Sequence, residues 1–422
     1  MTKNVYLLGV GVTHFKRWFK RDHIDLAREA LSEALSDAQL SEGTRLERVW
    51  FGNCGMNFWG QSNIRGQVVC APLASEGLLA ETPEVINVEG GCATGSLAVY
   101  GAMGDILSGR SDFAVALGVE KTFIAHDPAK ILELFSSGMN GWESESDLQF
   151  YRAEAERINT QFTPAEDRII LLDVSALHAQ AHMNRYGVTQ EQLACVASKS
   201  HAHGALNPKA QYQSEMSPEM ILADHEILHP FTRSMCAPIS DGAAAAILVS
   251  ENALKTLAPE TQARAIPIFA CEMTGGTRTS WDAESPTERA GKRAYKAASI
   301  NPSQLSLVEV HDATAYAELL HLEALGICPH GSAAQWTLEG HSRLDGVLPV
   351  NTSGGLISKG HPLGASGIAM IGEVMTQLRG EAAARQVKPQ SGRLEWGLTQ
   401  NGGGLLGFQE ASVIVTILGA PS

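Results

Sequence analysis

The sequence predicts an α/β protein that consists of two similar halves with an inserted loop region. Two observations predict this fold class. Strand and helix patterns alternate along the chain, and a glycine-rich turn that leads into a helix occurs twice, at residues 90–95 and 360–367. Apolar runs at residues 241–249 and 410–418 close the two halves in a similar way. Such a repeat indicates a duplicated unit, and chance similarity between two strand-turn-helix segments is the alternative.

The first half begins with a strand pattern at residues 5–10 and continues with apolar residues at helical spacing. The helical positions are Ile24, Ala27, Leu31, Ala34 and Leu35. Further strands are expected at residues 48–52 and 112–118, of which the second has the pattern of a fully buried strand. Because strands and helices alternate in this order, we expect a mostly parallel sheet that is covered on both faces.

A long insertion is expected at residues 121–238. It holds helix patterns at residues 167–185 and 191–203, and no part of it is low in complexity, so we expect ordered structure that covers the site. Pro259 and its polar neighbours predict a hinge near residues 256–265. We therefore predict an N-terminal half at residues 1–258, which includes the insertion, and a C-terminal half at residues 262–422.

Composition excludes several classes of protein. The chain has 422 residues, of which 44% are hydrophobic and 18% are charged, so it can bury a large core. Its formal net charge of −14, without a long basic cluster, argues against a nucleic-acid partner. Its 7 cysteines form no CxxC pair, which argues against a disulfide framework and a structural zinc site and predicts a reducing compartment.

The ends and the apolar runs of the chain carry no targeting signal. The first apolar run is too short for a signal peptide, and the last three residues are not a peroxisomal signal. No stretch approaches the roughly 20 apolar residues that a membrane-spanning helix needs. We expect a soluble cytoplasmic protein with no membrane contact and no metal site.

Cys92 is the first candidate for chemistry. It follows a strand end and two glycines and precedes a run of small and apolar residues, which places it on the first turn of a buried helix. Unpaired backbone N–H groups and the helix dipole favour a thiolate there, and a thiolate attacks carbonyl carbon, above all in thioesters. The alternative is that Cys92 is a small buried hydrophobe, as most free cysteines are.

Two histidines lie at turns rather than on helix faces. His311 ends a buried strand pattern, and His361 lies in the second glycine-rich turn. Strand ends of α/β sheets open onto crevices that hold reactive groups, and the duplication predicts that Cys92 and His361 meet across a pseudo-twofold axis. A structural role is the alternative for each histidine.

The glycine cluster after Gln400 is the third feature of interest. Glycines allow the backbone to approach a substrate closely and to present N–H groups to an oxyanion, so we expect Asn401, Gly403 and Gly404 to support an oxyanion site. A plain tight turn is the alternative. The segment at residues 351–355 is similar, with structural support as the alternative to a substrate site.

These motifs together resemble the thiolase superfamily. They are Gly-Gly-Cys-Ala-Thr-Gly at residues 90–95, Ser-Asp-Gly-Ala-Ala-Ala at 240–245, His-Asp at 311–312, and Asn-Thr-Ser-Gly-Gly-Leu-Ile-Ser-Lys-Gly-His-Pro-Leu-Gly-Ala-Ser-Gly at 351–367. The last block is highly specific, whereas the cysteine motif alone is weaker. The pattern is most similar to sterol-carrier-protein-type thiolases and bacterial thiolase-like proteins, and it spans nearly the whole chain.

The resemblance implies a thiolase fold with five layers, αβαβα, in a dimer or tetramer. It implies acyl transfer between an enzyme cysteine and coenzyme A thioesters, with coenzyme A as a substrate and no covalently bound cofactor. By analogy, Cys92 is the nucleophile, His361 is its base, and His311 helps to hold the thioester oxygen together with a water. The insertion would form a lid over coenzyme A, and Ser240, Ser353 and Gly354 would contact the substrate.

One departure from the family pattern concerns proton transfer. Thiolases usually carry a second cysteine that moves the α-carbon proton, but Ala313 stands in one of its two usual places and Gln400 or Asn401 in the other. A positioned acid or base contributes about 10²–10⁴-fold, so its loss needs an explanation. Either a histidine moves the proton, or cleavage yields a carbanion that is already stabilised, or the chain has left acyl transfer.

The sequence therefore predicts an acyl-CoA C-acyltransferase that cleaves a 3-oxoacyl-CoA by thiolysis or forms one by Claisen condensation. Phe135, Met139 and Trp142 in the insertion favour a bulky acyl chain, with a place in the core as the alternative. We expect a homodimer. The second hypothesis is an aldolase-like or non-catalytic subunit that works with a small zinc-containing OB-fold protein.

Overall fold

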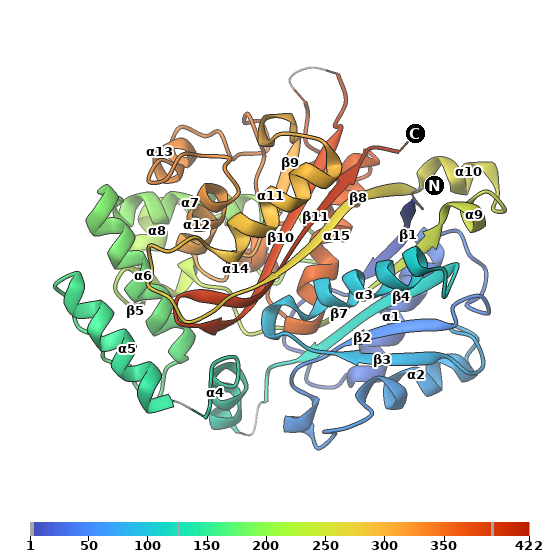
Figure 1. Cartoon of the computed structure of the whole chain (residues 1–422), viewed down its shortest axis with the longest axis horizontal. Helices are drawn as coiled ribbons and strands as arrows, with labels where there is room; N and C mark the ends of the chain where they lie inside the picture. The colour runs from blue at the N-terminus through green and yellow to red at the C-terminus, as the bar shows by residue number, and fades with distance from the viewer. Residues whose placement is uncertain (1–3, 125–126, 143, 390–391, 422) are drawn as a thin grey trace.

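The computed structural model describes residues 4–124, 127–142, 144–389 and 392–421, and a large mixed sheet forms its centre (Figure 1). Within these residues the sheet has 9 strands in the order β3-β2-β4-β7-β1-β8-β11-β10-β9. The strands are β1 (Val5–Val12), β2 (Arg48–Gly52), β3 (Glu84–Val88), β4 (Phe113–Lys121), β7 (Asp241–Ser250), β8 (Ile266–Gly275), β9 (Leu307–Val310), β10 (Trp396–Leu406) and β11 (Gln409–Gly419).

The order of the strands repeats on the two sides of the β1–β8 pair. On one side β1, β7, β4 and β2 follow one another, and on the other side β8, β11, β10 and β9 do. The first two pairings on each side are antiparallel and the third is parallel. The two halves that the sequence repeat predicts therefore share one topology. Their predicted limits at residues 258 and 262 flank the start of α10 (Pro259–Arg264), and this division stays a prediction.

The expectation of a mostly parallel sheet is wrong. Only the β2–β3, β2–β4 and β9–β10 ladders are parallel among the pairings of the described strands. A crossover helix between neighbouring strands imposes the parallel direction, but β7 follows the long insertion and β11 follows β10 through a short turn. Both strands are therefore free to run antiparallel to their neighbours.

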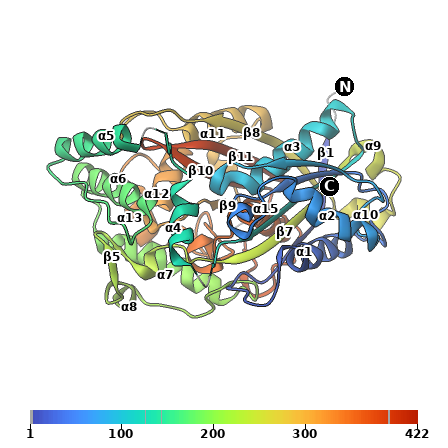
Figure 2. The same cartoon turned by 90° about the horizontal axis from the view of Figure 1, so that it is seen from below.

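Two helices pack between the halves of the sheet and make the middle layer of five. These are α3 (Thr94–Ser108) and α15 (Leu363–Leu378), which contact each other and strands of both halves. Outside them, α1 (His23–Asp37) covers the first half and α11 (Pro286–Ala298) the second (Figures 1 and 2). This order of layers is the αβαβα arrangement that the resemblance implies.

Glycines allow the middle helices to approach closely. A Cβ on Gly118 in β4 would lie 1.9 Å from the carbonyl oxygen of Gly364 at the start of α15, and one on Gly95 in α3 would lie 2.8 Å from the same oxygen. Side chains at these positions would push α15 away. The contact holds the starts of α3 and α15 next to each other.

The outer helix α1 follows the predicted periodicity. It begins with a capping box in which Asp22 and Asp25 satisfy each other's backbone N–H groups. Of the predicted apolar positions, Ala27, Leu31 and Ala34 are fully buried against the first half of the sheet. The helix is therefore held by one apolar face, as the sequence indicates.

The insertion is ordered and largely helical within its described residues. Its elements are α4 (Pro128–Ser136), α5 (Ser144–Arg157), α6 (Ile170–Tyr186), α7 (Gln190–Ala205), α8 (Pro218–Leu222), β5 (Glu226–Leu228) and β6 (Phe231–Thr232). The predicted helices at residues 167–185 and 191–203 are confirmed as α6 and α7. Tyr151, Phe162 and Phe408 pack α5 and α6 onto the turn between β10 and β11.

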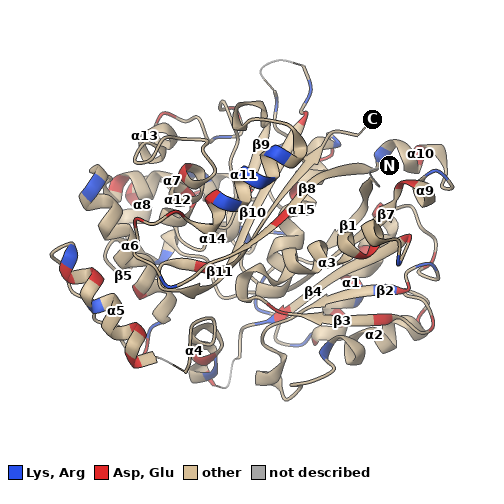
Figure 3. Cartoon of the chain, viewed as in Figure 1, with Lys and Arg blue, Asp and Glu red and all other residues tan. Residues whose placement is uncertain are grey.

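Two surface findings bear on partners. No helix of the described residues is both long and apolar enough to cross a membrane. In the ribbon view, Lys and Arg alternate with Asp and Glu, for instance along α5 (Figure 3). Helix α11 instead shows successive basic bands in this view, and its sequence contains Arg289, Lys292, Arg293 and Lys296.

Candidate active site

Cys92 lies at the junction of the first half with the middle layer. It belongs to a short 3-10 turn, η2 (Gly91–Ala93), that directly precedes α3, so Cys92 lies just before the first α-helical turn, whereas the sequence predicts that it lies on that turn. Gly91 has a φ of +57°, a conformation that side-chain-bearing residues rarely adopt. Half-buried Cys92 lines a cavity, and this glycine turn sets where its sulfur lies.

The glycine cluster of β10 packs against this turn. A Cβ on Gly403 would lie 2.2 Å from the carbonyl oxygen of Gly90 and 2.7 Å from the backbone nitrogen of Cys92. Gly403 and Gly404 both line the cavity that holds Cys92. This placement suits backbone donors for an oxyanion, and the role itself stays a prediction.

His361 lies in the loop before α15, and its Nδ1 is 2.8 Å from the hydroxyl oxygen of Ser366. That hydroxyl donates its proton to the carbonyl oxygen of Pro362, so it accepts a hydrogen bond from Nδ1–H. The other ring nitrogen, Nε2, is buried without a partner. Burial, the charge of His311 and the charge of Lys359 hold the pKa of His361 well below its usual value. His361 is therefore a neutral imidazole with a bare acceptor at Nε2.

His311 directly follows β9, where its backbone N–H donates to Oε1 of Gln400 at 3.1 Å. Its Nδ1 is 3.5 Å from Oε1 of Glu410, and its Nε2 has no geometric partner. Burial alone would lower the pKa of this ring. Hydrogen bonding and charge from Cys92 and Glu410 outweigh burial and raise the pKa of His311 to about 10. These neighbours therefore favour the protonated form of His311.

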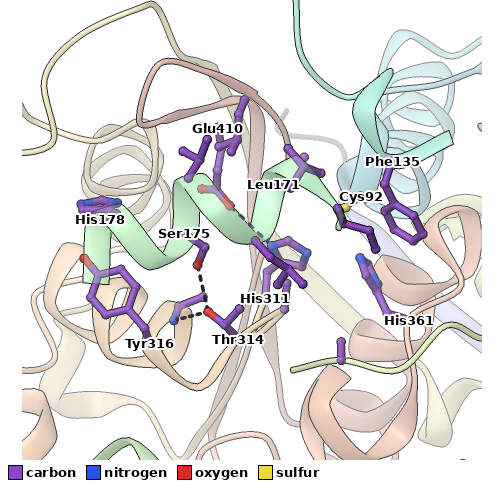
Figure 4. A pocket seen from close by; sticks show the side chains of 18 of the residues that line it. Cys92, Phe135, Leu171, Ser175, His178, His311, Thr314, Tyr316, His361 and Glu410 are labelled. Carbon is purple, nitrogen blue, oxygen red and sulfur yellow. Dashed lines mark hydrogen bonds and ion pairs between the residues drawn. The ribbon is translucent and has the colours of Figure 1, made fainter. Parts of the chain in front are cut away.

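Cys92, His311 and His361 meet at one place (Figure 4). Each contributes one atom, the sulfur or a ring nitrogen, and these three atoms lie within 4.8 Å of one another. The two rings are 5.2 Å apart between centroids. The site thus combines a sulfur nucleophile, a proton acceptor and a proton donor, and environments that push two pKa values apart are typical of acid and base pairs in enzymes.

The same side chains could also ligate an ion. Cys92, His311 and His361 form one set with the required spacing, and His311, His321 and Glu410 form a second. Both sets need His311, so they cannot be filled together. We interpret Cys92 as the nucleophile, His311 as the acid and His361 as the base. With His311 protonated and His361 neutral, the site has no charge that a metal ion would have to balance.

The cavity beside the three groups has a volume of about 180 Å³ and an apolar wall. Figure 4 shows it extending from Cys92 and Phe135, past His311, to Tyr316 and His178. The Tyr316 hydroxyl is buried without a partner, whereas the Ser175 and Thr314 hydroxyls lie 3.2 Å apart. Helix α6 of the insertion and α12 (Ala315–Ala324) each supply several residues of this wall.

Several predicted site residues lie outside the cavity wall. Ser353 donates its hydroxyl to Oε2 of Glu309 at 2.6 Å, and Gly354 packs on Gly204. Ser240 accepts the His361 backbone N–H at 3.1 Å, and Asn401 accepts the Ser96 hydroxyl of α3 at 2.9 Å. These four residues lie behind the cavity wall, and their predicted roles stay predictions.

The three apolar residues that were predicted to contact the acyl chain lie in different surroundings. Phe135 of α4 lines the cavity, as expected for a substrate contact. Met139 packs against the cluster between α5 and α6. The Trp142 side chain is 99% exposed and contributes neither to the core nor to the cavity wall. A sequence window cannot separate these outcomes, because neighbouring residues in a loop face different directions.

Sequence reasoning missed Glu410. The residue was included only as the first position of the closing apolar run, but its carboxylate lies between His311 and His321. An acidic residue near the start of a largely apolar strand, six residues after three successive glycines, is the signal that could have pointed to it. Thr287 and Gln400 complete its surroundings.

Comparisons with known proteins agree over the whole chain. The family model described as the thiolase N-terminal domain matches residues 11–228, and the one described as thiolase C-terminal domain-like matches residues 271–417. Sterol carrier protein 2 of Oryctolagus cuniculus is 33% identical over 97% of this chain and 73% of its own length. An acetyl-CoA acetyltransferase of Methanothermobacter thermautotrophicus is 32% identical over 95% of this chain and 97% of its own.

Solved structures share the fold. The chain titled "Ltp2-ChsH2(DUF35) aldolase" superposes with a TM-score of 0.76 and 22% identity, over 99% of this chain and 98% of that one. At this identity the likeness concerns the fold alone.

Proposed function

The chain belongs to the thiolase family, and we propose that it is an acyltransferase that moves acyl groups between coenzyme A thioesters through a thioester on Cys92. The observation that carries the proposal is the convergence of Cys92, His311 and His361 on one apolar cavity. A nucleophile with an acceptor and a donor at its side is what acyl transfer needs. The acetyltransferase name of a relative supports the same class of reaction.

The proposed reaction begins at the sulfur. Cys92 attacks the 3-oxo carbon of a 3-oxoacyl-CoA, and the bare Nε2 of His361 accepts the thiol proton. The bond between carbons 2 and 3 then breaks, the acyl group stays on Cys92, and acetyl-CoA leaves. Coenzyme A attacks the acyl-Cys92 thioester, which releases the shortened acyl-CoA and returns the proton from His361 to Cys92. Coenzyme A is a substrate in this scheme, and no bound cofactor takes part.

The backbone around Cys92 would hold the oxyanion that forms on attack. Gly403 packs against the Cys92 turn, and both Gly403 and Gly404 line the cavity. Backbone N–H groups in such a place stabilise a developing oxyanion without reorganisation. Asn401 contributes from behind, because its hydrogen bond with Ser96 ties β10 to α3.

The cavity favours a bulky apolar acyl group. Phe135, Leu171 and Leu320 are among the side chains that line it, and polar atoms are few. Two helices of the insertion, α4 and α6, supply part of the wall, so we assign to the insertion the binding of the acyl chain and of coenzyme A. Thiolytic cleavage is the direction we propose, and Claisen condensation is its reverse.

The proposal is tested by product analysis. Purified protein is mixed with coenzyme A and a 3-oxoacyl-CoA that bears an aromatic or branched chain, and thioesters are separated by chromatography. We expect acetyl-CoA and the shortened acyl-CoA in equal amounts, and no turnover by Cys92→Ser. Turnover that survives in Cys92→Ser would contradict the proposal.

A second function is favoured by a specific observation. Ala313 lines the cavity where the family usually has an acid/base cysteine, and the solved structure with a TM-score of 0.76 is titled an aldolase with a DUF35 partner. An aldolase-like or non-catalytic subunit, joined to a small zinc-containing OB-fold protein rather than to a second copy of itself, is the alternative. Release of an aldehyde or ketone from a 3-hydroxyacyl-CoA, with no need for Cys92, would favour it.

A further inference from the structure

Glu410 occupies an unusual position between two imidazoles. At the start of β11, its Oε1 is 3.5 Å from Nδ1 of His311 and 3.6 Å from Nε2 of His321. Its other oxygen, Oε2, accepts the Thr287 hydroxyl at 3.2 Å and lies 3.4 Å from Nε2 of Gln400. One carboxylate thus receives donors from α11, α12, β10 and the end of β9.

Gly402 of β10 leaves the space that the Glu410 carboxylate occupies. A Cβ on Gly402 would lie 1.7 Å from Oε1 of Glu410. Any other residue at 402 would therefore displace the carboxylate from His311. Two of the three successive glycines of β10 have separate tasks, because Gly402 admits Glu410 whereas Gly403 admits the Cys92 turn.

We propose that Glu410 makes His311 the acid and base at the α-carbon, in place of the second cysteine that thiolases usually carry. The inference rests on the proposed acyl transfer. His311 is the catalytic residue, because its Nε2 faces the reacting atoms beside Cys92. Glu410 is a positioning residue that orients the ring through Nδ1 and stabilises its positive charge.

The proton that His311 gives up in the first half-reaction returns to it in the second. When the bond between carbons 2 and 3 breaks, its electron pair goes to carbon 2, and the protonated His311 gives its Nε2 proton to that carbon to form acetyl-CoA. His311 is then neutral. In the second half-reaction the thiol of coenzyme A gives its proton to Nε2 of His311 as its sulfur attacks the acyl carbon. The ring is protonated again, and no other reagent is consumed.

The titratable groups around His311 support the roles of His311 as acid and base and of Glu410 as positioning residue. The titratable groups that face it are Cys92 from the η2 turn, His361 from the loop before α15, His321 from α12 and Glu410 from β11. Burial raises the pKa of Glu410, but His321, His311 and Thr287 outweigh it and lower the value, so Glu410 stays ionised. Burial lowers the pKa of His321, although the charge of Glu410 acts in the opposite direction. Of the two imidazoles beside Glu410, only His311 therefore has a raised pKa.

Glu410 also reaches a second cavity. Glu410 and His321 line a space of about 210 Å³ whose described wall includes Asp282 and Glu288 but not Cys92. Water in this space can exchange protons with the Glu410–His321 pair without crossing the substrate cavity. Glu410 and His321 therefore lie between the cavity that holds Cys92 and this second space.

The test measures proton transfer to carbon apart from acylation. Wild type and Glu410→Gln are incubated with acetyl-CoA in D₂O, and deuterium in the acetyl methyl group is followed by mass spectrometry. We expect exchange and kcat for thiolysis to fall by about 10²–10⁴-fold in Glu410→Gln, with KM little changed. Formation of acyl-Cys92 from a simple acyl-CoA is expected to fall by less than exchange, because the coenzyme A thiolate that leaves needs the His311 proton far less than carbon 2 does.

Two further variants make the result specific. Gly402→Ala keeps the carboxylate but displaces it, so it is expected to lose exchange in the same way even if Glu410→Gln does not fold. Glu323→Gln is the matched control, because Glu323 is a buried partner of His182 at 2.9 Å on the wall of the same second cavity. It is expected to exchange at the wild-type rate, and Glu410→Asp is expected to restore part of the loss.

The pH dependence of thiolysis shows whether Glu410 stabilises the charge of His311 or only orients its ring. Thiolysis needs protonated His311, whose pKa is about 10, so wild-type activity is expected to fall only as the pH rises towards that value. Loss of the Glu410 charge lowers the pKa of the ring, and the alkaline limb is expected to move to lower pH in Glu410→Gln. An unchanged limb, or exchange by Glu410→Gln at the wild-type rate, would overturn the inference.

The two proposals fail in distinguishable ways. Acyl-Cys92 formation with exchange that does not depend on Glu410 overturns this inference and leaves acyl transfer standing. Exchange that depends on Glu410 without any acyl-Cys92 supports this inference and contradicts the proposed function. A wild-type protein that neither acylates nor exchanges contradicts both.

Discussion

At the scale of single residues, one neighbour decides what each catalytic imidazole can do. Ser366 takes the Nδ1 proton of His361 and leaves Nε2 as an acceptor, whereas Glu410 faces Nδ1 of His311 and favours its protonated form. Both rings are buried and 5.2 Å apart, so burial alone would make them alike. The difference between base and acid therefore lies in the neighbours of the two rings, Ser366 and Glu410.

Replacement of Ser366 by alanine tests the role of His361. Without the hydroxyl, Nδ1–H loses its acceptor and the ring is free to take the other tautomer, in which Nε2 cannot accept the Cys92 proton. We expect kcat for thiolysis to fall at least about tenfold, with the fold unchanged by circular dichroism. Ser358→Ala, which removes a hydroxyl that donates to the Tyr212 carbonyl, is the control. Equal activities of the two variants would contradict the assigned tautomer.

A buried histidine far from the chemistry predicts how stability depends on pH. Burial, followed by the charge of Lys199, lowers the pKa of His203 to about 3, and its Nδ1 hydrogen bonds the Asn351 carbonyl. Below its unfolded pKa of 6.5, the unfolded chain binds a proton that the folded chain binds only near pH 3. The free energy of unfolding therefore decreases as the pH falls through this window.

Urea denaturation of His203→Asn between pH 6 and 4 measures this effect. The amide can keep the hydrogen bond to Asn351 but does not titrate. We expect the dependence of the free energy of unfolding on pH to become shallower by about 1.4 kcal/mol per pH unit, which is one proton. Parallel curves for variant and wild type would show that His203 is protonated in the folded protein.

At the scale of elements, small residues bring the two catalytic turns together. Helices α3 and α15 begin next to each other because Gly95, Gly118 and Gly364 carry no side chains. Cys92 precedes one helix and His361 the other, so the distance between sulfur and imidazole depends on this contact.

Gly118→Ala tests the contact between β4 and α15. The new Cβ would lie 1.9 Å from the Gly364 carbonyl oxygen, which is backbone and cannot turn aside. We expect a loss of about 1–3 kcal/mol in the free energy of unfolding and a lower rate of Cys92 acylation. Gly104→Ala in α3 meets no atom within 4 Å and is expected to stabilise by about 0.5–1 kcal/mol. A neutral Gly118→Ala would show that α15 can shift without consequence.

The elements also show where sequence reasoning reaches its limit. Periodicity placed α1, α6 and the strand at residues 48–52 correctly, because each depends on local patterning. The direction of β7 and β11 was wrong, since it is set by connections rather than by residues within the strands. The meeting of Cys92 with His361 followed from the repeat, whereas Glu410 was missed because the two imidazoles that it contacts, His311 and His321, lie 99 and 89 residues away in the sequence.

At the scale of the whole molecule, the insertion and the second half share one apolar cavity. Phe135 and Leu171 approach it from the insertion, whereas Ala313 and Ala317 approach it from the start of α12. The small residues leave the space that we assign to the acyl chain. We therefore expect the residues of the cavity wall, rather than the catalytic groups, to decide which length of acyl chain the protein accepts.

Ala317→Phe tests this assignment. A phenyl ring in the cavity would take the place of the acyl chain but leave Cys92 and the two histidines unchanged. We expect kcat/KM for a bulky 3-oxoacyl-CoA to fall by at least about tenfold, whereas that for acetoacetyl-CoA changes little. Steady-state kinetics with both substrates gives the answer, and an equal loss for both would mean that the cavity does not hold the acyl group.

The central claim is that Cys92 carries the acyl group, and mass spectrometry of the intact protein after mixing with an acyl-CoA tests it most directly. The account predicts a mass increase of one acyl group, located on the peptide that contains Cys92, absent from Cys92→Ser and removed by free coenzyme A. An unchanged mass with every acyl-CoA tried, or an adduct on another residue, would contradict it.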